Sequence, residues 1–183
     1  ISAMIKSMRG SDPDAAVFYL AKMLEAGEDP KFIARRVIVH AAEDVGIADP
    51  QALVIANAAA KAVEFVGLPE ARIPLAEAVI YIATAPKSNS VIKAIDKASK
   101  FVKNNDSLSV PSHLKDSHYS GAEDLNNGEG YLYPHNYPNN YIKQKYLPEK
   151  VEKEKFYDPG SLGQEKKVKK WLNDLKSKEG SRK

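Results

Sequence analysis

The fold of this chain follows from residues 27–62, whose sequence is GEDPKFIARRVIVHAAEDVGIADPQALVIANAAAKA. Twice in this stretch a glycine precedes an Asp-Pro pair, first at Asp29-Pro30 and again at Asp49-Pro50. Glycine ends a helix in the left-handed conformation, aspartate caps the free N–H groups of the next helix, and proline fits its first position. The stretch therefore predicts helices over 30–45 and 50–66, joined by a tight turn.

The same signals continue on both sides of this stretch. Gly10 precedes Asp12-Pro13 upstream, and downstream Gly67 and Pro69 break the chain before Pro74 begins another helix. Together with apolar residues at helical spacing, these signals predict four more helices, over 1–9, 13–26, 74–85 and 90–104. Antiparallel neighbours joined by such short turns form an orthogonal or solenoid-like helical bundle, so the predicted fold class is all-α.

The composition changes near residue 105 and divides the chain into three predicted parts. The first 100 residues contain 22 alanines, the strongest helix formers, whereas seven of the nine tyrosines follow residue 105. We expect a bundle over 1–104 and an irregular Tyr/Pro-rich wrap over 105–160, which packs on the bundle and contains one short helix near Ala122. A basic tail over 161–183 then forms a short amphipathic helix over 166–177 or is disordered.

The net charge of +3 is small but unevenly distributed. Residues 1–100 are neutral, residues 101–142 carry −3, and residues 143–183 carry +6, with 13 Lys and Arg against 7 Asp and Glu. Such a basic C-terminus can contact nucleic acid or simply keep a tail solvated. No apolar run is long enough for a membrane span and cysteine is absent, so we expect a cytoplasmic protein with no membrane partner. The chain begins with Ile rather than Met, which suggests a piece of a longer protein.

Catalysis is the weaker interpretation of this sequence. It contains no GxxxxGK[ST], GxGxxG, HExxH or GxSxG motif, and we predict no catalytic, cofactor-binding or metal-binding residue. The best metal candidate combines His113, His118, Asp116 and Glu123, but surface groups in a turn explain these residues more simply. A hydrolase that uses His113, His118 and Glu123 is the remotest of the functions considered.

Two basic segments are candidates for contact with DNA or phosphate. Lys87, Ser88 and Asn89 precede the last bundle helix, where free N–H groups and a lysine suit a phosphate, although ordinary N-capping is the alternative. Lys143, Lys145 and Lys150 alternate with tyrosines, as in surfaces that bind single-stranded nucleic acid. Docked tyrosines beside solvated lysines explain the second pattern equally well.

Other charged residues lie within the predicted bundle. Arg35 and Arg36 are adjacent on a helix, so at most one faces the core; we expect a salt bridge to a neighbouring helix or a contact with another subunit. Glu43 and Asp44 also diverge on a helix, and we interpret them as helix-end charges rather than paired catalytic carboxylates. His40 follows an apolar run and is expected to be a hydrogen-bonded core or interface histidine.

Several short segments occur in one order along the chain: Arg9–Ala16, Ile33–Arg36, Ala42–Gly46, Gly67–Ala76, Pro86–Ser90, Val110–Tyr119, Gly130–His135 and Gln144–Pro148. In this order they resemble the C-terminal region of the replication-associated recombination protein A family. This family is also called maintenance of genome stability protein A and is related to the Werner helicase-interacting ATPase. The resemblance covers about residues 1–160.

The resemblance implies that the chain follows an AAA+ ATPase module related to clamp-loader subunits, which this sequence does not contain. ATP and Mg²⁺ bind in that module, so no catalytic residue is carried over to this chain. The C-terminal region is similar to the helical collar of clamp loaders and forms homotetramers. Members are DNA-dependent ATPases that act at stalled replication forks, with DNA and single-strand DNA-binding protein as partners, and are expected in the cytoplasm at the nucleoid.

Our leading hypothesis is an oligomerisation domain that assembles the parent ATPase into a homotetramer. Residues 52–62 are almost all small and apolar, which predicts a helix buried on most of its circumference and close approach between helices. The alternative is a DNA-binding module that contacts single-stranded or fork DNA through the basic C-terminal region. Its affinity would fall steeply with salt.

Overall fold

The computed structural model describes residues 1–106, 108–116 and 128–177. Throughout this part of the chain the regular structure is helical and no strand is present, which confirms the predicted all-α fold class. The α-helices are α1 (Ser2–Arg9), α2 (Pro13–Glu25), α3 (Pro30–His40), α4 (Gln51–Phe65), α5 (Arg72–Thr84), α6 (Ser90–Lys103) and α7 (Glu165–Ser177).

Aspartate caps set the starts of the early helices, as predicted. The Asp12 carboxylate accepts a hydrogen bond from the Ala15 N–H at 2.9 Å, and the Asp29 carboxylate accepts one from the Lys31 N–H at 2.9 Å. Asp49 caps the start of α4 in the same way. Because these contacts are local in sequence, the predicted starts of α2, α3 and α4 agree with the structure to within one residue.

Three local predictions are wrong in detail. The left-handed residue after α1 is Ser11, with φ of 60°, and not Gly10, whose φ is −79°. Pro74 does not begin α5, which starts two residues earlier; it lies in the first turn, where a missing N–H is still harmless. The predicted helix over 30–45 is not one α-helix, since α3 ends at His40 and a π-helix, Ala41–Val45, follows it.

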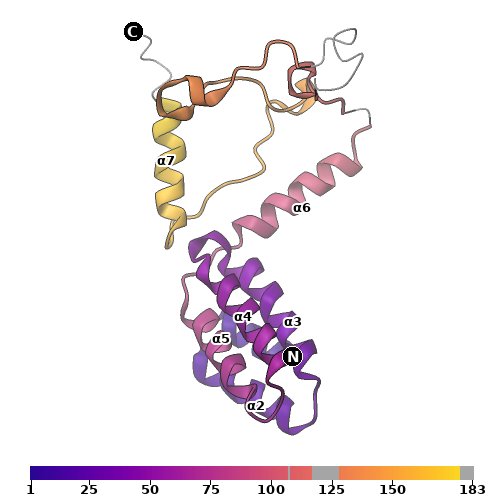
Figure 1. The fold of residues 1–183 in the computed structure, drawn as a ribbon, viewed down its shortest axis with the longest axis vertical. Coiled ribbons are helices and arrows are strands. Elements are labelled where there is room, and N and C mark those ends of the chain that lie inside the picture. The colour runs from indigo at the N-terminus through magenta and orange to yellow at the C-terminus, as the bar shows by residue number, and fades with distance from the viewer. Residues whose placement is uncertain (107, 117–127, 178–183) are drawn as a thin grey trace. The chain divides into compact units, whose positions relative to one another are not determined.

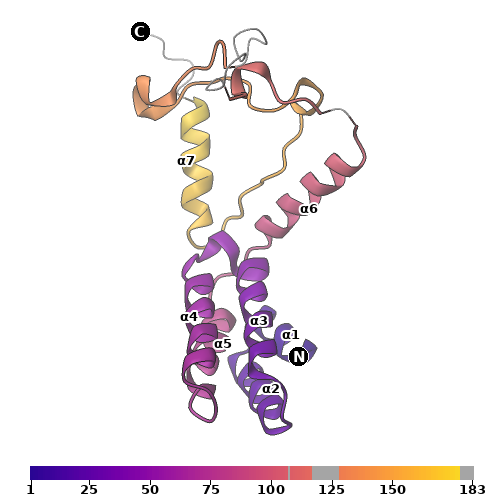
Figure 2. The ribbon, with the colours of Figure 1, turned by 45° about the vertical axis from the view of Figure 1, so that its right-hand side comes forward.

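The chain divides into two compact units, each described by itself. The first unit comprises residues 1–95 and 157–171, and the second comprises residues 96–156 and 172–183. In the first unit α4 packs beside α5, and α5 also contacts α1 and α2 (Figure 1). Figure 2 shows α3 running beside α4. The bundle core is formed by buried side chains from all five helices, chiefly Met4, Met8, Ala16, Leu20, Ile33, Val37, Ala56, Val63, Leu75, Val79 and Ile82.

Helix α4 is less buried than its composition predicts. Its buried residues are Ala52, Ala56, Ala59 and Val63, which form a single face. The residues between them are largely exposed, including apolar Leu53, Val54 and Ala58. The prediction of a helix buried on most of its circumference is therefore wrong for a single copy of the chain, and part of an apolar surface is left uncovered.

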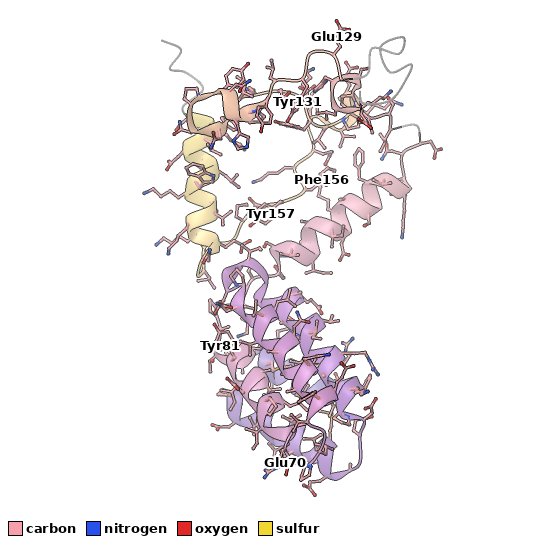
Figure 3. All side chains as sticks on the ribbon, in the orientation of Figure 1. Glu70, Tyr81, Glu129, Tyr131, Phe156 and Tyr157 are labelled. Carbon is pink, nitrogen blue, oxygen red and sulfur yellow. The ribbon has the colours of Figure 1, made fainter. Side chains whose placement is uncertain are left out.

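The second unit is built from short elements. Single-turn 3₁₀ helices lie at Ser112–Leu114, Pro134–Asn136, Pro138–Asn140 and Glu149–Val151. The ring of Phe156, labelled in Figure 3, packs edge-on against Phe101 of α6 with 5.9 Å between ring centroids. Lys97 of the same helix lies 3.0 Å from a carboxylate oxygen of Glu154.

Two predictions about the second half have different outcomes. The amphipathic helix expected over 166–177 is present as α7, whereas the short helix expected near Ala122 falls outside the described residues. The packing of the 105–160 segment on the bundle stays a prediction. Among the described helices, none combines the length and the hydropathy that crossing a bilayer requires.

Candidate functional site

A partly buried cluster of ionisable side chains lies at the π-helix of the first unit. His40, the last residue of α3, is only 1% exposed, and its Nδ1 lies 2.6 Å from Oδ2 of Asp44. Arg9, at the end of α1, donates to both oxygens of that carboxylate, from Nε at 2.8 Å and from Nη2 at 3.0 Å. Glu43 Oε1 is more distant, 3.5 Å from Arg9 Nη2. Asp44 therefore ties α1 and α3 to the π-helix.

The electrostatics of this cluster favour a structural role. Burial lowers the pKa of His40, and the nearby Asp44 carboxylate opposes this effect only in part. The hydrogen bond to Asp44 raises the pKa of Arg9. Nitrogen and carboxylate oxygens of His40, Glu43 and Asp44 all lie within 4.8 Å of one another, a spacing that a metal ion could bridge. The Arg9 guanidinium already binds both Asp44 oxygens, however, so the cation of this cluster is part of the chain.

Sequence reasoning identified part of this cluster. It predicted His40 as a hydrogen-bonded core or interface histidine, and the burial of the ring agrees with the core position. Asp44 is not merely a helix-end charge, because it is buried and ion-paired. Arg9 was missed, since a residue 35 positions away along the chain gives no local signal of the contact.

The predicted phosphate contact at Lys87, Ser88 and Asn89 lies next to the same cluster. The Lys87 ammonium donates to the backbone carbonyls of Ala83 at 2.9 Å and Ala85 at 2.6 Å, and burial lowers its pKa. Its hydrogen bonds therefore point back to the end of α5. Ser88 donates its N–H to the Asp44 carbonyl at 2.8 Å, which joins this loop to the π-helix.

A carboxylate of the chain itself occupies the start of α6. Glu165, the first residue of α7, is fully buried, and its Oε1 accepts hydrogen bonds from Ser90 Oγ and, at 2.9 Å, from the Tyr157 hydroxyl. Tyr157 is labelled in Figure 3. Burial tends to raise the pKa of Glu165, but hydrogen bonds from the surrounding hydroxyl groups outweigh it, so that the pKa is lowered. Burial together with this hydrogen bond raises the pKa of Tyr157 to about 12.

Close backbone contacts hold Glu165 in this position. The Gln164 N–H donates to the Ala48 carbonyl at 2.8 Å. A Cβ on Gly163 would lie 2.2 Å from that same oxygen, and a Cβ on Gly160 would lie 2.8 Å from Glu165 Oε2. We call residues 157–165 the latch segment. Sequence reasoning missed it, because Gly160 and Gly163 resemble ordinary loop glycines and Glu165 resembles an ordinary acid in a first helical turn.

The remaining predicted site residues lie elsewhere. Arg35 is exposed, and its Nη2 lies 3.7 Å from Asp29 Oδ2 at the cap of its own helix, while Arg36 is half-buried. In the second unit Lys143, Lys145 and Lys150 are all exposed. Lys145 forms an ion pair with Glu152 at 3.1 Å, and the His113 ring nitrogen Nε2 lies 2.7 Å from the Lys145 carbonyl. Of the predicted metal candidate, His118 and Glu123 lie outside the described residues.

A second feature of the first unit is a set of large apolar side chains that are exposed on the α4–α5 hairpin. Its most exposed members are Phe65, at 88%, and Ile73, at 62%. We call this set the α4–α5 surface; it comprises Leu53, Val54, Phe65, Val66, Leu68, Ile73 and Ile80. A groove of about 560 Å³ runs along α5 and is lined by Arg72, Ile73, Ala76, Glu77, Ile80, Tyr81 and Thr84.

Comparison with known proteins gives matches over most of the chain. Residues 10–176 match the family described as MgsA AAA+ ATPase C terminal. The chain is 50% identical over 163 residues to Replication-associated recombination protein A of Bacillus subtilis, covering 89% of this chain and 38% of that protein. It is 48% identical over 177 residues to an uncharacterized AAA domain-containing protein of Mycobacterium tuberculosis, covering 97% of this chain and 39% of that protein. With ATPase WRNIP1 of Dictyostelium discoideum the identity is 38% over 159 residues, or 86% of this chain and 18% of that protein. The chain thus spans less than half the length of these relatives.

Proposed function

This chain belongs to the family of MgsA AAA+ ATPase C-terminal domains, and we propose that it assembles copies of its parent ATPase into a homotetramer. Relatives with 38–50% identity bear names that refer to replication and recombination. The proposal follows from the resemblance to clamp-loader collars and from the surface of the first unit. We expect the assembly contacts to lie within residues 1–95.

The observation that carries this proposal is the α4–α5 surface. Large apolar side chains gathered on one hairpin mark an interaction site more often than an ordinary surface. Burying one such side chain stabilises an interface by about 1.5–3 kcal/mol. Burial of any four of the seven would therefore offset much of the translational and rotational entropy that association costs. The small residues of α4, such as Ala58, also allow the backbones of two copies to approach closely.

Tyr81, which lines the groove together with Ile73 and Ile80 of this surface, makes a hydrogen bond to the residue that caps α4. The Tyr81 hydroxyl, on a residue labelled in Figure 3, donates to Asp49 Oδ2 at 2.7 Å. Asp49 also caps α4, so a single carboxylate fixes the start of α4 and one wall of the groove on α5. A preformed wall reduces the conformational entropy that binding must overcome.

Sedimentation velocity at two protein concentrations and two salt concentrations tests this proposal. We expect a tetramer whose stability changes little with salt, because apolar burial depends weakly on ionic strength. Replacing Ile73 and Ile80 with Glu should give a monomer of unchanged helical content by circular dichroism. The control is Val39→Glu, an exposed apolar residue on α3 outside the hairpin, which should leave the tetramer intact. A wild-type chain that stays monomeric in every condition would refute the proposal.

The second candidate function is contact with single-stranded or fork DNA. It is supported by the net charge of +6 over residues 143–183 and by the names of the relatives. The predicted residues Lys143, Lys145 and Lys150 are all exposed, and Lys145 is paired with a glutamate. Binding that weakens steeply with salt supports this function, and binding absent at low salt excludes it.

Further properties are proposed for the full-length protein. We propose that its ATPase module binds ATP and Mg²⁺, that single-strand DNA-binding protein is a partner, and that the protein acts in the cytoplasm at the nucleoid. The support is the family assignment. We also propose that the full-length protein is a DNA-dependent ATPase, and a full-length chain whose ATP hydrolysis is unaffected by DNA would contradict this.

A further inference from the structure

The first two turns of α7 carry an unusual concentration of lysine. Four of the five residues after Glu165 and before Trp171 are lysines, namely Lys166, Lys167, Lys169 and Lys170. All four are exposed, and Trp171 itself is 52% exposed. Residues 165–171 belong to the first unit, so this surface is described without reference to the second.

The acid that begins this helix does not neutralise the lysines. Glu165 is fully buried and accepts its hydrogen bonds from Ser90 and Tyr157 inside the first unit. The outer side of these two turns is therefore left with four positive charges and no negative one. A net charge counted from the sequence of these two turns would include the negative charge of Glu165, although that carboxylate is buried away from the lysines.

Some lysines of the chain are paired with acids, and in the part of the chain that the structure describes the four α7 lysines are not. Lys61, Lys97 and Lys145 lie 3.8, 3.0 and 3.1 Å from glutamate oxygens. Within the described residues, none of the four α7 lysines has a carboxylate oxygen within 4.0 Å. Like charges on consecutive turns repel each other, so an anion bound across them is favoured.

The spacing of these residues suits a strand of phosphates with attached bases. Lys166 and Lys170 are four residues apart, and so are Lys167 and Trp171, so each pair lies on one side of the helix. A phosphate held by Lys167 would place a neighbouring base within reach of the Trp171 indole. Stacking on an aromatic ring beside a cationic groove is the general mode of binding unpaired nucleic acid.

We infer that the first two turns of α7 bind single-stranded nucleic acid, with the four lysines on phosphates and Trp171 stacked on a base. The inference rests on the second candidate function and assigns the contact to α7 instead of Lys143, Lys145 and Lys150. A lipid surface is the less suitable occupant. Val168, the other apolar residue of these turns, is already partly buried in the protein, so only one large apolar side chain is available for insertion.

The experiment uses Trp171 as its reporter, because it is the single tryptophan of the 183-residue chain. A short oligodeoxythymidine is titrated into the protein at several salt concentrations. We expect saturable quenching of Trp171 emission, and a slope of log affinity against log salt near −2.8, from about −0.7 for each of four phosphates neutralised on a single strand. Replacing Lys166 and Lys170 with Gln should reduce the slope by about 1.4 and weaken binding roughly 25-fold at about 0.1 M salt.

A matched control separates this surface from general charge. Lys6→Gln and Lys22→Gln remove two exposed charges from α1 and α2, and we expect that pair to change the affinity by no more than about twofold. Glutamine is nearly as good a helix former as lysine, so circular dichroism should show intact helices in both variants. Trp171→Ala, followed through a labelled oligonucleotide, should weaken binding about 5- to 150-fold.

Three outcomes would overturn the inference. If the labelled oligonucleotide binds while Trp171 emission is unchanged, and Gln at Lys143, Lys145 and Lys150 abolishes binding, the second candidate function stands and α7 is the wrong surface. If nothing binds at low salt, that function fails as well. If vesicles containing phosphatidylserine shift Trp171 emission and the oligonucleotide does not, the partner of α7 is a membrane.

Discussion

Substituting Gly163 with Ala tests the latch segment directly. Gly163 has φ of 54°, and a Cβ there would lie 2.2 Å from the Ala48 carbonyl oxygen and 2.9 Å from Pro86 Cγ. The first contact is far inside van der Waals distance and involves backbone, so the latch segment must move away. That movement breaks the hydrogen bond from the Gln164 N–H to Ala48 and displaces Glu165 from Ser90 and Tyr157.

The expected magnitude follows from three contributions. The left-handed backbone costs alanine about 1–2 kcal/mol, partly offset by about 0.4–1 kcal/mol from the lower entropy of the unfolded chain. A lost backbone hydrogen bond adds about 1 kcal/mol, and the loss of hydrogen bonds to a buried carboxylate adds about 1.5–3 kcal/mol. Gly163→Ala should therefore lower the free energy of unfolding by about 3–5 kcal/mol.

Gly27→Ala is the matched control for this substitution. Gly27 also has positive φ, at 80°, but a Cβ there would have no atom within 4 Å. It should cost only the net backbone contribution, about 1 kcal/mol. Urea unfolding followed by circular dichroism and by Trp171 emission gives both values. If Gly163→Ala costs no more than Gly27→Ala, the latch segment is not held as described.

Three further predictions concern ionisable groups of the first unit. Asp44→Asn should destabilise the chain by about 1–3 kcal/mol in urea unfolding, because Arg9 and His40 lose their shared partner, whereas Glu43→Gln should cost less than about 0.5 kcal/mol. Because burial lowers the pKa of His40 below 6.5, the unfolded chain binds the proton more readily, so stability should fall as the pH drops below about 6.5. This acid slope, measured by urea unfolding at several pH values, should shrink in His40→Gln; an unchanged slope would assign it to other groups. The raised pKa of Tyr157 predicts stability that is complete below pH 10.0 and lost as the pH rises towards about 12, and Tyr157→Phe should remove this contribution in alkaline unfolding.

The parts of this fold that could be predicted from sequence depend on contacts between near neighbours. Asp12 and Asp29 cap helices that begin one residue later, so the sequence itself contains both partners of each hydrogen bond. The position of the left-handed residue after α1 was missed by one, because Gly10 and Ser11 are both compatible with a tight turn and the helix's own hydrogen bonds decide between them.

The parts that could not be predicted depend on contacts between distant residues. Ser90 and Glu165 are 75 positions apart, and nothing near either residue indicates a buried carboxylate. Such a group is stable only when every surrounding donor is placed by the tertiary fold. The exposure of α4 was missed for a related reason, since an alanine-rich helix does not reveal whether its second face is covered by the same chain or by another copy.

The two proposed surfaces can be separated by their physical chemistry. The α4–α5 surface is apolar, so assembly through it should persist as salt is raised, whereas four unpaired lysines on α7 give a contact that salt weakens. Because the latch segment anchors the first two turns of α7 within the first unit, a tetramer would carry four copies of these basic turns on one particle. Once one copy has bound a long strand, the other copies are held at high effective concentration near it, so the overall affinity is higher than that of a single contact. The monomeric variant with Glu at Ile73 and Ile80 should consequently bind a long single strand more weakly than the wild type does. It should bind a short oligonucleotide equally well. Equal affinity of the two proteins for the long strand would show that assembly and nucleic-acid contact are independent.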